Sequence, residues 1–187
     1  MNAAHMEYCA SDDWRRLVHE TILPEALRGV DLGADAIEVG PGPGFTTDIL
    51  CTMTARLTAV EIDEGLAGSL AERMAGANVD VVVGDASALQ FPADRFSGGA
   101  SFHMLHHIAP ADLQDRVFSE LARVLVPGAV LVGADGIYND ATAAFHEGDT
   151  YNPIDPGELG ARLGRAGFVE VDVRTYDLGW VCTARAA

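Results

Sequence analysis

The feature that most constrains the fold is a glycine-rich segment, Gly40-Pro41-Gly42-Pro43-Gly44, between a short apolar run and a helical pattern. The apolar run, residues 36–39, predicts a strand, and residues 46–54 predict a helix. Glycines at this junction let the backbone turn tightly and approach a ligand without a Cβ in the way. A strand, such a loop and a helix in succession are typical of the ligand-binding edge of an open α/β sheet.

Apolar runs and helical patterns alternate along the rest of the chain. The expected strands are 57–60, 79–83, 99–102 and 130–132, and the expected helices are 11–29, 66–74, 113–125 and 156–167. This alternation predicts an α/β fold with an open, mostly parallel sheet covered by helices on both faces. Two final strands, 169–175 and 179–184, are joined by a short turn, so they must pair antiparallel.

The glycine loop does not match two common phosphate-binding motifs. A dinucleotide Gly-x-Gly-x-x-Gly pattern fails because Phe45 stands at its last position, and Pro41 and Pro43 lack the N–H donors that a pyrophosphate needs. A Walker A loop needs a lysine, and the chain has none. Glu61, after the second strand, can accept from ribose hydroxyls, and Asp85, after the third, from an adenine amino group. The pattern predicts a nucleoside pocket without a phosphate cradle.

Four motifs in order resemble those of the class I S-adenosylmethionine-dependent methyltransferases. They are Glu38-x-Gly40-x-Gly42-x-Gly44, Val60-Glu61-Ile62-Asp63, Gly84-Asp85-Ala86 and Arg123-Val124-Leu125-Val126-Pro127-Gly128. The resemblance covers roughly residues 30–184. It implies S-adenosyl-L-methionine as cofactor and S-adenosyl-L-homocysteine as product. It also implies a Rossmann-like, doubly wound sheet in the order 3-2-1-4-5-7-6 with strand 7 antiparallel, which agrees with the predicted hairpin.

The resemblance further implies which residues touch the cofactor. The glycine loop would pack against the methionine moiety, Glu61 would hold the ribose, and Ile62 would cover the adenine. The expected cofactor-binding residues are Glu38, Gly40, Pro41, Gly42, Gly44, Glu61, Ile62, Asp85, Ala86, Phe102 and His103. One departure is Phe96-Ser97, where the family often has Phe-Asp, and here we expect a local change in the turn rather than lost binding.

Three histidines, His103, His106 and His107, follow the fourth expected strand and would share one face of a helix. A histidine there can take the proton of an oxygen or nitrogen acceptor. His106, followed by His103, is the expected catalytic residue, although these side chains could instead only line the pocket or cap a helix. The expected substrate contacts are His107, Tyr138, His146, Tyr151 and Tyr8. No metal site is expected, because no carboxylate with ligand spacing accompanies the histidines.

The chain divides into two parts. Residues 1–29 form an N-terminal arm and helix that could close over the pocket as a lid, although Trp14 could equally be a core anchor. Residues 30–187 form the S-adenosylmethionine-binding methyltransferase domain. Within it, the polar segment 137–152 would lie over the pocket, where it could select the substrate or serve as an ordinary connection.

The composition bears on partners and location. Twelve basic and 28 acidic residues give a net charge of −16, which argues against binding to nucleic acid or anionic membranes. The expected partner is a small-molecule acceptor, and the protein is expected to be a monomer or homodimer. Three scattered cysteines and a start without a signal-peptide pattern favour a cytoplasmic location. No apolar run approaches the roughly 18 residues that span a bilayer.

The predicted function is therefore methyl transfer to an oxygen or nitrogen of a small molecule. Two alternatives remain, an RNA or protein methyltransferase and a non-catalytic S-adenosylmethionine-binding module. Ser101-Phe102-His103-Met104 stands where nucleic-acid methyltransferases carry an Asn/Asp/Ser-Pro-Pro-Tyr/Phe signature. Val60-Glu61-Ile62-Asp63 does resemble the ribosomal-RNA adenine dimethylases, but only locally.

Overall fold

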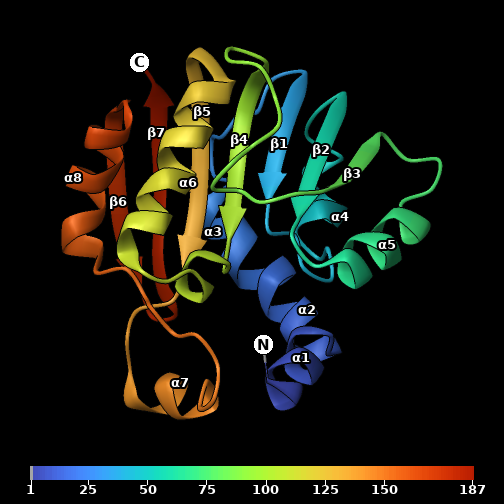
Figure 1. Cartoon of the computed structure of the whole chain (residues 1–187), viewed down its shortest axis with the longest axis vertical. Helices are drawn as coiled ribbons and strands as arrows, with labels where there is room; N and C mark the ends of the chain where they lie inside the picture. The colour runs from blue at the N-terminus through green and yellow to red at the C-terminus, as the bar shows by residue number, and fades with distance from the viewer. Residues whose placement is uncertain (1) are drawn as a thin grey trace.

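The computed structural model describes residues 2–187 and contains a seven-stranded sheet in the order β3-β2-β1-β4-β5-β7-β6 (Figure 1). The strands are β1 Asp35–Val39, β2 Arg56–Glu61, β3 Val79–Val83, β4 Phe96–Phe102, β5 Leu125–Asp135, β6 Phe168–Tyr176 and β7 Gly179–Ala186. Strands β1 to β5 are parallel, and β7 is antiparallel to both of its neighbours. The predicted order and orientation are confirmed.

Helices cover both faces of the sheet and extend past one edge of it. They are α1 Ala3–Cys9, α2 Asp12–Leu17, α3 Leu23–Ala26, α4 Thr47–Leu50, α5 Glu64–Arg73, α6 Ala111–Val124, α7 Asp140–Phe145 and α8 Pro156–Ala166, with a π-helical turn η1 Val18–Ile22 and a 3-10 turn η2 Leu105–His107. Ser11 and Asp155 cap α2 and α8 with their side chains, as their sequence positions predict. Helix α1, capped by Asn2, was not anticipated.

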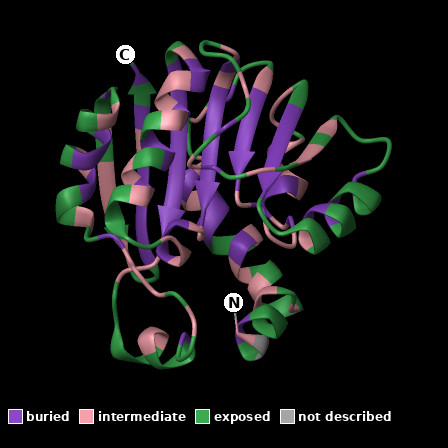
Figure 2. Ribbon diagram, in the orientation of Figure 1, coloured by how far each residue is buried: buried purple, intermediate pink, exposed green. Residues whose placement is uncertain are grey.

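The core lies on both sides of the sheet, whose central strands β1, β2 and β4 are each buried at all but one residue (Figure 2). Parallel strands covered on both faces are expected to be almost continuously apolar. On one face, α6 contributes Val117, Phe118, Leu121 and Val124 to a cluster with α8. On the other face, η1 and α3 contribute Ile22 and other apolar side chains to a second buried cluster. Among residues 2–187, none of the helices combines the length and apolarity needed to cross a bilayer.

The departure at Phe96-Ser97 is a local packing arrangement. The Ser97 hydroxyl accepts from the Asp35 N–H at 2.9 Å and lies 2.9 Å from the Leu32 carbonyl oxygen. The next residue, Gly98, packs so closely that an added Cβ would lie 2.5 Å from the same Leu32 oxygen. Ser97 and Gly98 therefore fix the entry into β1 against β4, far from the glycine loop.

The carboxyl ends of β1, β2, β4 and β5 meet at one edge of the sheet, and α1, α2 and α7 lie beyond that edge (Figure 1). The N-terminal arm contacts the α7 segment there. The Asn2 N–H donates to Asp149 Oδ2 at 3.0 Å, and its side-chain amide donates to the Phe145 carbonyl at 3.1 Å. Two segments that lie far apart in the sequence thus meet over the strand ends.

We predict opposite effects of one substitution at two glycines. Gly98→Ala should destabilise the protein by about 1–3 kcal/mol, because the added Cβ overlaps the Leu32 backbone, which cannot move aside. Gly68→Ala, on the exposed face of α5 with open space around it, should stabilise by about 0.4–1 kcal/mol. Urea denaturation of both variants measures this, and equal effects would contradict the packing described for β4.

Candidate active site

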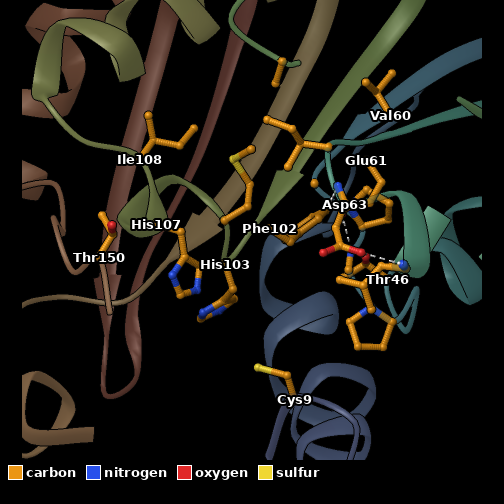
Figure 3. A pocket seen from close by; sticks show the side chains of 18 of the residues that line it. Cys9, Thr46, Val60, Glu61, Asp63, Phe102, His103, His107, Ile108 and Thr150 are labelled. Carbon is orange, nitrogen blue, oxygen red and sulfur yellow. Dashed lines mark hydrogen bonds between the residues drawn. The ribbon is translucent and has the colours of Figure 1, made fainter. Parts of the chain in front are cut away.

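A cavity of about 500 Å³ opens at the carboxyl edge of the sheet (Figure 3). Most of the expected cofactor-binding residues line it, namely Gly40, Pro41, Gly42, Glu61, Ile62, Asp85, Ala86, Phe102 and His103. Glu38 and Gly44 are not among its lining residues. The ends of β1, β2, β3 and β4 thus converge on one pocket, as the order of the motifs predicts.

The glycine loop adopts backbone conformations that favour glycine. Gly40 and Gly42 have φ values of +67° and +54°, in the left-handed region where a Cβ is unfavourable. A Cβ on Gly40 would lie 2.7 Å from that of Met104, whereas nothing lies within 4 Å of the Cβ position of Gly42. Gly40 therefore allows close packing against Met104, and Gly42 leaves space for a ligand beside the backbone.

Gly44 serves the packing of the loop rather than the cavity. A side chain there would collide with Leu70 of α5, and its φ is +83°. The Arg73 guanidinium donates to the carbonyls of Pro43 at 2.9 Å and Gly44 at 3.0 Å, and it also pairs with Asp48. Helix α5 is thereby fastened to the outside of the loop.

Glu38 lies beneath the loop and is almost fully buried. Its carboxylate accepts hydrogen bonds from the hydroxyls of Thr46 and Thr47, the latter at 2.6 Å. Burial raises the pKa of Glu38 to about 7, opposed by the two threonine hydrogen bonds and assisted by the charges of Asp48 and Glu61. Its role in this structure is to fasten the loop to the start of α4.

Glu61 ends β2 with its carboxylate directed at the loop. It accepts from the Gly42 N–H at 2.9 Å through one oxygen and from the Asp63 N–H at 3.0 Å through the other. A carboxylate has about four lone-pair sites, so both oxygens can still accept from a ligand hydroxyl. Ile62 beside it is 68% exposed, an apolar surface at the cavity wall. The free acceptor sites of Glu61 and the apolar surface of Ile62 together fit the nucleoside part of S-adenosylmethionine.

His103 follows β4 with a φ of +50° and points into the cavity. Its ring lies edge-on to Trp14 at 5.1 Å between centroids, and its Nε2 is buried with no hydrogen-bond partner among the described residues. Its Nδ1 is 3.9 Å from Asp135 Oδ1. Burial lowers the pKa of His103 to about 4, and the charge of Asp135 only partly offsets this. The ring is therefore neutral at pH 7.

His106 turns away from the cavity toward Asp135. Its Nδ1 lies 2.5 Å from Asp135 Oδ1, and its backbone N–H donates to Oδ2 at 3.1 Å. Burial lowers the pKa of His106, but the charge and hydrogen bond of Asp135 outweigh it and leave the value raised. His107 lines the cavity instead. The geometry therefore reverses the sequence-based preference for His106 over His107 as the side chain facing an acceptor.

The expected substrate contacts separate into two groups. His107 lines the cavity, whereas Tyr8, Tyr138, His146 and Tyr151 are not among its lining residues. Tyr138 is 61% exposed, and Tyr151 stacks on His146 at 4.4 Å between centroids. The wall is completed by side chains not proposed as contacts from the sequence. Among them are Met6 and Cys9 of α1, Trp14 of α2, and Asp149 and Thr150 after α7.

These wall residues carry no motif of their own. Trp14, Cys9 and the segment 137–152 could be suspected of covering the pocket only because they flank the expected strands. Their actual positions depend on the contact between α1 and the α7 segment, including the 5.0 Å approach of the His5 and Phe145 rings. No local sequence pattern encodes that contact.

The family to which the chain belongs follows from a comparison of sequences. The family model described as "Methyltransferase domain" matches residues 37–133, more than half of the chain. The chain is therefore a member of the methyltransferase domain family, and S-adenosylmethionine is its cofactor.

Curated relatives match part of the chain. A probable ribosomal RNA small subunit methyltransferase A of Halobacterium salinarum is 43% identical over 75 residues, covering 38% of this chain and 26% of the relative. A protein of the same name from Pyrobaculum aerophilum is 37% identical over 111 residues, covering 54% of this chain and 47% of the relative. The chain thus matches only about a quarter to a half of the length of these relatives.

A solved structure agrees with the fold along the whole chain. An Aquifex aeolicus S-adenosylmethionine-dependent methyltransferase has a TM-score of 0.75 at 19% identity, with full coverage of both chains. The names of the curated relatives contradict the expectation, based on the acidic charge and on the missing nucleic-acid methyltransferase signature at residues 101–104, that nucleic acid is excluded as a partner. Net charge was a poor guide because it describes the whole surface, whereas an acceptor meets only the mouth of the cavity.

We predict that Glu61→Ala weakens S-adenosylhomocysteine binding by more than tenfold. The substitution removes an acceptor for the ribose and releases the Gly42 N–H, and hydrogen bonds to a charged group are worth about 1.5–3 kcal/mol. Isothermal titration calorimetry measures the affinity. Glu64→Ala, an exposed carboxylate three residues later, is the matched control and should bind as the wild type does. Unchanged affinity in Glu61→Ala would refute this role.

A second prediction concerns pH. Because the pKa of Glu38 is raised from 4.5 to about 7 in the folded protein, folding retains a proton that the unfolded chain releases. Its contribution to stability is therefore largest below pH 4.5 and declines as pH rises toward 7. Relative to Glu38→Gln, the wild type should lose about 3 kcal/mol between pH 4.5 and 7.5, at about 1.4 kcal/mol per pKa unit. Urea titrations at both pH values test this, and a constant difference would contradict it.

Proposed function

We propose that this methyltransferase transfers the methyl group of S-adenosylmethionine to a nucleotide of RNA that enters the cavity past His103 and His107. The observation that carries the transfer is one continuous cavity, which runs from the glycine loop and Glu61 to these two histidines and Thr150. The ribosomal RNA methyltransferase names of the curated relatives support RNA as the acceptor class. Their matches cover 38% and 54% of this chain.

The charge of the chain constrains how RNA would be held. With no lysine and a net charge of −16, contacts to the phosphate backbone must be few, and these normally supply much of the affinity. Recognition would then depend on one unstacked base held against aromatic side chains. Trp14, Phe102 and the two histidines supply such surfaces in the cavity wall. A single-stranded or flipped-out nucleotide is the form that such a pocket accepts.

The bound cofactor supplies an electrophilic methyl group, and the protein has to align a nucleophile with it. Alignment in a closed pocket contributes most of the acceleration. The unpartnered Nε2 of neutral His103 can accept a hydrogen bond from the N–H or O–H of an acceptor, which would orient the attacking lone pair. Asp135, 3.9 Å from Nδ1, would stabilise the ring if it takes up the proton.

A small-molecule acceptor is the second candidate. It is favoured by the acidic composition and by a cavity of about 500 Å³, within the usual range for small-ligand sites. The enzyme would hold such an acceptor through the same histidines.

The acceptor class is tested with radiolabelled S-adenosylmethionine. Small ribosomal subunits, protein-free single-stranded RNA and a library of small hydroxylated and amino compounds are offered separately. RNA as acceptor predicts label that is precipitated with acid and released by ribonuclease. Glu61→Ala is the matched control and should abolish incorporation at limiting cofactor. Label that enters only small molecules would overturn the RNA proposal in favour of the second candidate.

The role of His103 is tested with His103→Asn, because asparagine tolerates the positive φ of this position. Single-turnover methyl transfer should slow by about 10²-fold, the lower end of the usual loss of a proton acceptor. Affinity for S-adenosylhomocysteine should stay close to that of the wild type. A turnover equal to that of the wild type would remove His103 from the chemistry, and a change confined to KM would leave it as a binding contact.

A further inference from the structure

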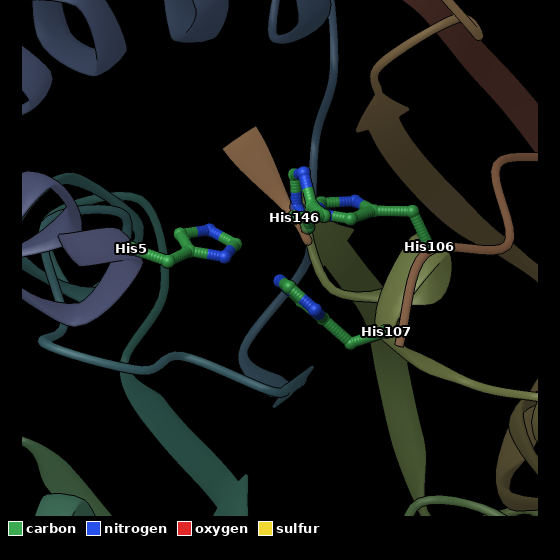
Figure 4. A group of neighbouring side chains, drawn as sticks. All are labelled: His5, His106, His107 and His146. Carbon is green, nitrogen blue, oxygen red and sulfur yellow. The ribbon is translucent and has the colours of Figure 1, made fainter. Parts of the chain in front are cut away.

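Four histidines from three separate parts of the chain converge beside the cavity (Figure 4). His5 lies on α1, His106 and His107 on η2, and His146 directly after α7. Each offers a ring nitrogen, and these nitrogens all lie within 4.8 Å of one another. Methyl transfer as described above uses only His107 of this group, as part of the cavity wall.

Two of the rings already direct one nitrogen to an outer partner. His106 Nδ1 lies 2.5 Å from Asp135 Oδ1, and His146 Nδ1 lies 2.7 Å from the Thr142 carbonyl oxygen. In metal sites a ligating histidine usually donates its other ring N–H to a carboxylate or a backbone carbonyl, which fixes the tautomer and the ring orientation. Both rings therefore have Nε2 left for a ligand.

Buried ring nitrogens in the cluster lack partners. Nε2 of His146 and Nδ1 of His107 are buried with no hydrogen-bond partner among the described residues. His146 itself is only 4% exposed. A buried polar atom without a partner costs free energy, about 1–3 kcal/mol. One ring nitrogen of each histidine in the cluster lies within 4.8 Å of the others, so a cation bound among the rings would give the cluster a partner that the protein does not provide.

We propose that His5, His106, His107 and His146 bind a divalent first-row transition metal ion, with Zn²⁺ as the best fit. Imidazole ligands suit this class of ion, and four protein ligands without an open position are typical of structural zinc. Zn–N bonds of about 2.0–2.1 Å place tetrahedral ligands about 3.4 Å apart. The rings must therefore close in by about an ångström, and His106 gives up any proton on Nε2.

The surroundings suit a cation. Asp135 contacts His106, and Asp149 Oδ2 lies 3.4 Å from His5 Nδ1, so two carboxylates would offset the charge of a divalent ion. The sequence predicts no metal site, because no carboxylate with ligand spacing accompanies His103, His106 and His107. His5 and His146 come from distant segments, and a shared ion would fasten α1 and the α7 segment to η2 at the cavity mouth.

The test measures metal directly and does not depend on the acceptor. Full-length protein is purified without a histidine tag, loaded with Zn²⁺, dialysed and analysed by plasma mass spectrometry. About one equivalent per chain is expected. Competition with a chromophoric chelator then gives the Kd of the wild type, His5→Gln and His146→Gln. Loss of a hydrogen-bond partner of a ligating histidine typically weakens metal binding ~10–100-fold. Loss of a ligating histidine itself should weaken metal binding by more than this.

His19→Gln is the matched control, because His19 lies outside the cluster and its ring contacts the Phe45 carbonyl. The Kd of this variant for the metal should stay within about threefold of the wild-type value, as expected for a distant site. Titration with S-adenosylhomocysteine confirms that each variant is folded and separates failure of this proposal from failure of the proposed function. Co²⁺ should give the intense visible bands of tetrahedral coordination in the wild type. A wild type that retains no metal, or equal Kd values in the cluster variants and the control, would overturn the proposal.

Discussion

Two carboxylates fix the conformation of the glycine loop, and the rest of the site depends on them. Glu38 fastens the far end of the loop through the hydroxyls of Thr46 and Thr47. Glu61 reaches across from β2 to the Gly42 N–H. These bonds are made within the protein, so they fix the shape of the loop, and a fixed loop loses little ordering entropy when it binds a ligand. A buried carboxyl under the loop is costly, as the raised pKa of Glu38 shows.

The acceptor side of the pocket is built differently. Its wall comes from α1, α2 and the segment after α7, which lie beyond the strand ends and meet one another through Asn2, Asp149 and the rings of His5 and Phe145. The cofactor side rests on a sheet, whereas the acceptor side rests on a contact between short helices. The metal ion that we propose for the histidine cluster would add metal–ligand bonds, which would fix the relative positions of these helices.

Much of the fold could be predicted from the sequence because the relevant signals are local. The valine-rich run at 79–83, the Ser11 and Asp155 caps and the glycine loop each specify nearby backbone, and the family resemblance supplied the strand order. The orientation of His106 could not be predicted, since it depends on Asp135, which lies 29 residues further along the chain. The convergence of His5 with His146 was missed for the same reason: neither residue has a local pattern that points to the other.

The strand ends around the glycine loop form the S-adenosylmethionine site, and the bond from Glu61 to Gly42 fixes the loop. Hydrogen–deuterium exchange with and without saturating S-adenosylhomocysteine tests both statements. Slower exchange is expected at residues 40–46, 61–66, 84–87 and 102–104, with the β6–β7 hairpin unchanged. The Gly42 amide, already bonded to Glu61, is also expected to be protected before ligand is added. Protection confined to other parts of the chain, or none at saturation, would contradict the account.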